Sequence, residues 1–160
     1  MLFSIWIYAL AFCLQENQIQ HKEYEKKYYP NGAIKEEGWV LNSEKIGYWK
    51  FYQQNGKLSS EGHFFNNEKD KYWYFYQPNG SPESEGHFKE GLKNGWWSFY
   101  SVKGVLARKC QFKSGQLHGY AMEYKNKKLY KAEKYENGTK IGEWYDLASF
   151  KRDNKSQNPE

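Results

Sequence analysis

The 160-residue chain is poor in cysteine, proline and methionine, with two, four and two copies respectively. Its two cysteines, Cys13 and Cys110, are too few for a disulfide framework or a zinc site. The apolar N-terminal stretch is shorter than the roughly 20 residues that a membrane-spanning helix needs. The net charge of +5 is spread along the chain among interleaved glutamates. This pattern argues against a nucleic-acid-binding surface.

Patterns typical of enzymes are also missing. The chain has no paired carboxylates, Ser-His or Cys-His arrangement, or glycine-rich phosphate loop that stands apart from its repeats. His63 and His87 are repeat equivalents, and we expect them two strands apart, about 10 Å, which is too far for one zinc ion. We therefore expect no catalytic residues, no metal and no cofactor, and we expect each histidine to stack beside Tyr48 or Tyr72.

Aromatic residues are abundant, at 20% of the chain, and they recur with a fixed period. The same residue type returns every 24 positions in several series. These are Tyr28, Tyr52, Tyr76, Tyr100 and Tyr124; Gly32, Gly56, Gly80 and Gly104; Trp49, Trp73 and Trp97; and Gly38, Gly62 and Gly86. Cys110 stands in the next glycine position, and Ala121 replaces the next tryptophan. Such spacing is the signature of stacked supersecondary units.

Each repeat is predicted to be a β-hairpin. Asn31-Gly32, Asn55-Gly56 and Asn79-Gly80 match a two-residue type I′ turn between strand-forming segments. The fold class is therefore all-β, an elongated single-layer antiparallel meander of about five 24-residue hairpins. We expect three regions, with an N-terminal hydrophobic segment at 1–20, the repeat array at 21–146 and a polar tail at 147–160. Within the tail, DLASFKRD is predicted to form a short turn of helix.

The turns also predict the strand register. With Asn55-Gly56 as the loop, Trp49 lies opposite Gly62 and Tyr48 opposite His63, and the next hairpin repeats both pairs 24 residues later. We expect each indole to lie across the glycine that faces it in its own hairpin. Because side chains alternate between the faces of a sheet, the tryptophans share an apolar face while the tyrosines share the opposite, wetter face.

The combination of a Tyr-x-x-Asn-Gly-x-Leu turn, a Glu-Gly strand and a Gly-x-Trp start to the next hairpin resembles the MORN-repeat variant of bacterial proteins. The resemblance covers roughly residues 24–145. It implies a sheet that binds partner proteins or associates with membranes, and some family members are described as antitoxin-like. It implies no single activity.

The N-terminal stretch MLFSIWIYALAFC contains no charged side chain. It is similar to the apolar region of a secretory signal peptide, with Ala9-Leu10-Ala11 as a cleavage site. Alternatively, residues 10–13 resemble a lipobox in which Cys13 carries the lipid. A third interpretation is a buried N-terminal strand or helix of a cytosolic protein. We expect an extracytoplasmic location, with the cytoplasm as the alternative.

The tyrosine-rich face is the feature that points to a function, namely binding. Tyrosine offers a large contact area and has few rotatable bonds whose freedom is lost on binding. Its alternative role is to stabilise the sheet through cross-strand aromatic pairs. The candidate binding residues are Tyr48, Tyr52, Tyr72, Tyr74, Tyr76, Trp96 and Tyr100. We expect an exported, non-catalytic binding module with a protein partner. The alternatives are a membrane-surface lipoprotein held through the N-terminus and an antitoxin-like neutraliser of a toxin.

Overall fold

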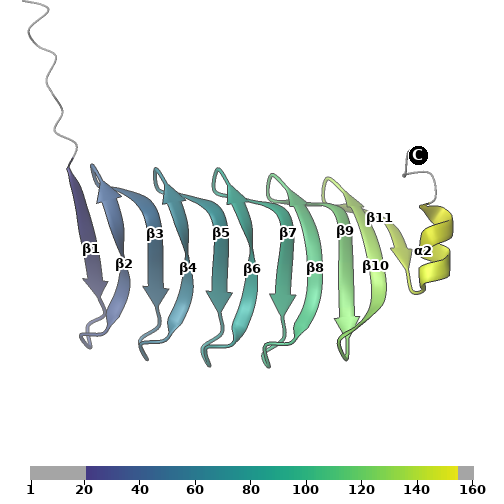
Figure 1. Ribbon diagram of the computed structural model, residues 1–160, viewed down its shortest axis with the longest axis horizontal. Helices are drawn as coiled ribbons and strands as arrows, with labels where there is room; N and C mark the ends of the chain where they lie inside the picture. Colours follow the sequence, from purple (N-terminus) through teal and green to yellow (C-terminus); the bar gives the residue numbers. More distant parts are fainter. Residues whose placement is uncertain (1–20, 155–160) are drawn as a thin grey trace, which may run out of the picture.

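The computed structural model describes residues 21–154, which form one open antiparallel sheet followed by a short helix (Figure 1). The strands lie side by side in sequence order as an elongated single layer, so the predicted meander is confirmed. They are β1 (Lys22–Tyr28), β2 (Ile34–Leu41), β3 (Glu44–Tyr52), β4 (Leu58–Phe65), β5 (Glu68–Tyr76), β6 (Pro82–Lys89), β7 (Leu92–Tyr100), β8 (Leu106–Lys113), β9 (Gln116–Lys125), β10 (Lys128–Glu136) and β11 (Thr139–Trp144).

Helix α2 (Leu147–Asp153) occupies the segment where a short helix was predicted, and it begins after the N-cap Asp146. Over residues 21–154 we find no helix with the length and apolar character required to cross a bilayer. The predicted signal segment, with Cys13 and its lipidation, and the end of the polar tail lie outside the described residues.

The Asn-Gly loops are not two-residue type I′ turns, contrary to the prediction. A type I′ turn needs positive φ at both central residues, whereas only Gly56 of the Asn55-Gly56 pair has it, at φ 79°. The loop is longer, with the Gly56 N–H donating to the Gln53 carbonyl and the Gln53 N–H to the Lys57 carbonyl. Asn55 instead accepts a hydrogen bond from the Lys57 N–H and donates to the Pro78 carbonyl of the next loop. Its amide therefore links successive loops.

Two-residue turns connect the strands at their other ends, opposite the Asn-Gly loops. Asn42 and Ser43 both have positive φ, at 50° and 68°, and so do Asn66 and Asn67, at 47° and 65°. These residues join β2 to β3 and β4 to β5. Asparagine tolerates the left-handed region better than most residues, which explains its use there.

The predicted strand register is confirmed, because Trp49 pairs with Gly62 and Tyr48 with His63, and Trp73 with Gly86. The predicted lean of the indole is wrong. A Cβ on Gly62 would overlap Trp73 of the following strand rather than Trp49, and a Cβ on Gly86 would overlap Trp97. Each tryptophan thus covers the glycine of the strand before its own.

A β-bulge explains this lean. The register of β4 and β5 shifts after Gly62, where Lys71 takes a positive φ of 60°. The equivalent positions in other repeats are glycines, Gly47 and Gly95, with the same backbone conformation. At the bulge the His63 carbonyl accepts a hydrogen bond of 2.9 Å from the indole Nε1 of Trp73. The buried indole donor is therefore satisfied only when the ring tilts toward β4.

We call the side of the sheet that carries Trp49, Trp73 and Trp97 the tryptophan face. These three side chains are fully buried within a single layer, because each packs against phenylalanines of its own and adjacent strands. The column ends at Cys110 and Ala121, which face each other in the glycine and tryptophan positions of the last unit.

Ionic residues replace the aromatic column at both ends of the tryptophan face. At the N-terminal end, Lys27 contacts Glu25 and Glu36, at 3.3 and 3.2 Å, and Glu25 occupies the position equivalent to Trp49. At the C-terminal end a larger cluster follows Cys110. Polar terminal units of this kind allow a repeat array to end in water.

Candidate functional site

The opposite side of the sheet, which we call the tyrosine face, carries the seven predicted binding residues in rows across β3, β5 and β7. The outer row contains Tyr48, Tyr72 and Trp96, and Tyr120 on β9 continues it. Tyr74 lies between the rows, and an inner row contains Tyr52, Tyr76 and Tyr100. The structure therefore brings all seven onto one face.

The inner row holds the sheet together through its phenol groups. The hydroxyls of Tyr52, Tyr76 and Tyr100 donate to Glu37, Glu61 and Glu85, at 2.6, 2.7 and 2.6 Å. Burial and the hydrogen bond to Glu85 raise the pKa of Tyr100 to about 12. The pKa of Tyr76 is also raised, first by burial and then by Glu61. The inner row is thus committed to cross-strand hydrogen bonds between half-buried groups.

Two residues of the outer row, Tyr48 and Trp96, and the intervening Tyr74 are freer to contact another molecule. Tyr48, Tyr74 and Trp96 each expose 38% of their surface. Tyr48 and Tyr72 pack edge-to-face on His63 and His87, with ring centroids 5.0 and 4.8 Å apart, as predicted. This packing fixes the rings while leaving area exposed.

The tyrosine face already carries one helical segment. Phe150 of α2 packs against Tyr120 and Trp144, with centroids 5.6 and 5.4 Å apart. The Tyr120 hydroxyl donates to Asn154 Oδ1 at 2.9 Å, and the Trp144 indole donates to Asp153 at 2.9 Å. Because Tyr120 is the repeat equivalent of Tyr48, Tyr72 and Trp96, this contact uses an outer-row position. Sequence reasoning missed it because Phe150 lies outside the repeat.

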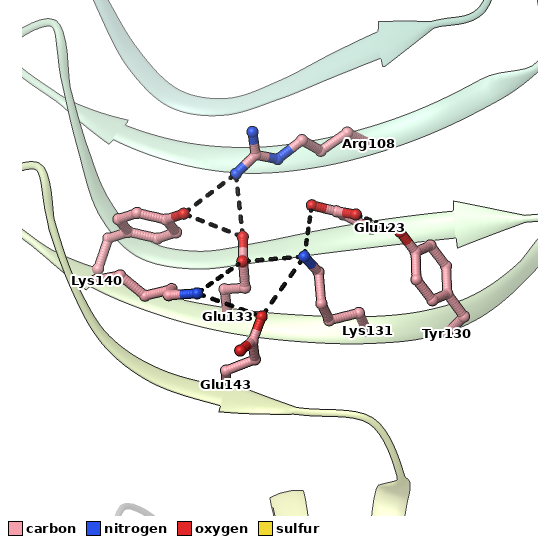
Figure 2. Close-up of polar contacts among 8 residues, drawn as sticks. Arg108, Glu123, Tyr130, Lys131, Glu133, Lys140 and Glu143 are labelled. Atoms are coloured by element: carbon pink, nitrogen blue, oxygen red, sulfur yellow. Dashed lines mark hydrogen bonds and ion pairs between the residues drawn. The ribbon is translucent and has the colours of Figure 1, made fainter.

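A second candidate is the charged cluster at the C-terminal end of the tryptophan face (Figure 2). Glu133 is only 4% exposed and contacts Arg108 at 3.2 Å, Lys131 at 3.1 Å and Lys140 at 3.6 Å. Lys131 also contacts Glu123 and Glu143. Burial alone would raise the pKa of Glu133, but the hydrogen bonds and positive charges around it lower the pKa below its usual value.

The cluster is balanced, with Arg108, Lys131 and Lys140 opposite Glu123, Glu133 and Glu143. Each charge has at least one oppositely charged partner within the group. Among residues 21–154 no group of histidine, cysteine or acidic side chains has the arrangement of a metal site. We interpret the cluster as a cap for the aromatic column.

Three lysines that sequence reasoning did not single out lie on the tryptophan face. Lys45, Lys69 and Lys93 each precede a tryptophan by four residues, and their ammonium groups lie over Trp49, Trp73 and Trp97, at 4.1, 4.7 and 4.3 Å from the ring centroids. Their 24-residue spacing is a signal that could have identified them.

No protein-family model matches the chain. No curated protein matches it either. Several solved structures resemble it over part of their length. The accessory secretory protein 1, 2 and 3 structure from Streptococcus pneumoniae is 18% identical with a TM-score of 0.36, covering 63% of this chain and 19% of that chain. The glycosylation-associated protein complex from Streptococcus agalactiae is 13% identical with a TM-score of 0.40, covering 81% and 23%.

A mutant of S. aureus TarM, in complex with fondaparinux, α-GlcNAc-glycerol and UDP, is 15% identical with a TM-score of 0.28, covering 78% of this chain and 23% of that chain. The chain thus spans about a fifth of the length of each of the three. TM-scores this low assign neither a family nor an activity, and the resemblance to MORN repeats stays a prediction.

Proposed function

We propose that this protein is a non-catalytic binding module whose tyrosine face holds another protein. The observation that supports the proposal is the packing of α2 against Tyr120. Phe150 of the chain's own helix packs beside Tyr120, and Asn154, which caps the C-terminus of that helix, accepts a hydrogen bond from the Tyr120 hydroxyl. The repeat equivalents Tyr48, Tyr72 and Trp96 carry no such segment within residues 21–154, so the same surface is open over three further repeats.

The rigidity of the surface favours binding. Strand pairing, the inner-row hydrogen bonds and the packing of Tyr72 on His87 hold the outer aromatics in place before a partner arrives. A surface ordered in advance loses little side-chain entropy on association. Aromatic anchors of this type carry much of the energy of many protein interfaces. The exposed Tyr48, Tyr74 and Trp96 are the anchors we propose.

The test is the triple variant Tyr48→Ser, Tyr74→Ser and Trp96→Ser, compared with the wild type in pull-downs from the native host. Each captured protein is identified by mass spectrometry, and its affinity is then measured with purified components. Truncated anchors typically cost about 2 kcal/mol each, so we expect the affinity to fall at least a hundredfold. Circular dichroism melting should show a folded variant.

A matched control replaces Tyr52, Tyr76 and Tyr100 with phenylalanine. These changes remove the hydroxyls that bind Glu37, Glu61 and Glu85 but keep the rings. We expect lower stability with binding retained. A folded serine variant that keeps its partners would refute the tyrosine face as the binding surface.

We also propose that the chain is exported, on the basis of its uncharged, apolar N-terminal stretch. Cell fractionation that finds protein containing Met1 in the cytosol would contradict export. Metabolic labelling with a palmitate analogue, compared between wild type and Cys13→Ser, separates a lipidated from a cleaved form.

A further inference from the structure

The lysine row on the tryptophan face has an unusual setting. The Lys69 ammonium lies 4.7, 4.9 and 5.4 Å from the ring centroids of Trp73, Phe75 and Phe88. Lys93 repeats the arrangement over its own tryptophan and two phenylalanines, at 4.3, 5.0 and 5.3 Å. Each ammonium therefore lies within cation–π distance of three aromatic rings.

The first repeat shows what such a lysine binds. Lys45, the equivalent of Lys69, contacts Glu36 Oε2 at 2.9 Å, and both side chains are largely buried, at 22% and 13% exposure. Twenty-four and 48 residues after Glu36 stand Ser60 and Ser84. A serine is too short to reach the ammonium in the same way. Within residues 21–154, neither Lys69 nor Lys93 has a carboxylate within ion-pair distance.

The missing carboxylate leaves an open space beside Lys69, and it leaves both lysines with the electrostatic cost of burial. A hollow of about 370 Å³ is lined by residues that include Phe51, Ser60, Phe64 and Lys69. Burial lowers the pKa of Lys69 and of Lys93, and the charge of Lys93 lowers that of Lys69 further. An acid in the hollow would relieve this cost through an ion pair of the kind that Glu36 makes with Lys45.

We propose that an acidic helical segment of a partner protein docks on the tryptophan face and places one carboxylate on Lys69 and another on Lys93. The spacing determines the geometry. Lys69 lies on β5 and Lys93 on β7. These strands are two positions apart along the long axis of the sheet (Figure 1), which is about 9.6 Å at the usual strand separation. Carboxylates about seven residues apart on one face of a helix are separated by about 10.5 Å. A helix that crosses the strands therefore matches both lysines.

This site lies on the opposite face from the proposed tyrosine-face interface, and the two can be tested separately. The probe is a synthetic alanine-rich helical peptide with two glutamates about seven residues apart. One control peptide carries glutamines instead, and a second has the same composition with one glutamate moved to the other side of the helix. Affinities are measured by isothermal titration calorimetry at low ionic strength with the full chain.

We expect the paired-glutamate peptide to bind and both control peptides to bind much more weakly. Lys69→Gln and Lys93→Gln should each lower the affinity about fivefold. Lys50→Gln, an exposed lysine of the tyrosine face, should leave it unchanged, and so should the Tyr48→Ser, Tyr74→Ser, Trp96→Ser variant. If that variant loses its natural partner but still binds the peptide, the two surfaces are independent.

A second pair of variants places the missing carboxylate on the protein itself, at the serine positions equivalent to Glu36. Ser60→Glu and Ser84→Glu should reproduce the Glu36–Lys45 contact, raise the melting temperature and abolish peptide binding. This arm stays informative if the lysine variants unfold. Equal binding of the glutamate and glutamine peptides, or unchanged binding by a folded Ser60→Glu, Ser84→Glu variant, would overturn the proposal. Binding of a uronic-acid polysaccharide without binding of the peptide would also overturn it.

Discussion

Gly86→Ala tests the packing of the indole column most directly. The new Cβ would lie 2.5–2.6 Å from three indole carbons of Trp97, whereas carbon atoms pack at about 3.5–4.0 Å. The ring must therefore move by about 1 Å. Overpacking of this kind costs about 1–3 kcal/mol, and the move also weakens the 3.0 Å bond from the Trp97 indole to the His87 carbonyl, worth about 1 kcal/mol. Alanine regains about 0.5–1 kcal/mol over glycine in a strand.

The net expectation is a loss of about 1–3 kcal/mol in the free energy of unfolding, measured by urea denaturation followed by circular dichroism. A double-mutant cycle identifies the ring involved. In a Trp97→Ala background, Gly86→Ala should cost nothing, because the alanine pair approximates the natural Cys110–Ala121 pair of the last unit. In a Trp73→Ala background the full cost should remain. Coupling to Trp73 instead of Trp97 would refute the observed lean of the indole.

Three further predictions concern the backbone, the inner row and the buried thiol. Lys71→Gly should raise the melting temperature by about 2–4 °C, because φ 60° is strained for lysine and natural for glycine; a lower melting temperature would contradict this. Because the pKa of Tyr100 is raised from 10.0 to about 12 in the fold, its contribution to stability is complete below pH 10 and is lost as the pH rises through 12. Denaturation at stepped alkaline pH should show this loss, and Tyr100→Phe should reduce it. Burial raises the pKa of the Cys110 thiol, so in a Cys13→Ser background a thiol reagent should react slowly with the native protein and rapidly in denaturant; fast native labelling would show that this strand opens readily.

The 24-residue period was sufficient to predict the meander, the two faces and the pairing of Trp49 with Gly62. The register was right although the turn was wrong, because a bulge between Phe51 and Tyr52 takes up the extra loop residue. An Asn-Gly pair fits both a type I′ turn and a longer loop with one left-handed glycine, so local sequence cannot distinguish them.

The direction of the indole could not be predicted in the same way. Trp49 is in register with glycines on both sides, Gly38 and Gly62, so sequence alone leaves two equivalent choices. The choice depends on the bulge, which frees a carbonyl for the indole N–H on one side only. The contact between Phe150 and Tyr120 could not be predicted either. A seven-residue helix outside the repeats has no sequence pattern that indicates which strand it packs against.

The charged caps make the length of the array adjustable. Between them, Gly38, Gly62 and Gly86 each lie against the tryptophan of the following strand, so duplicating 24 residues within this part of the array creates a junction with the same glycine–tryptophan packing. Each duplication would add two strands, about 9.6 Å, to both faces at once. Gene-level gain or loss of a unit can therefore change the reach of the surface in steps, without redesign of the ends. Such steps would lengthen the proposed binding surface while leaving the contacts within each unit unchanged.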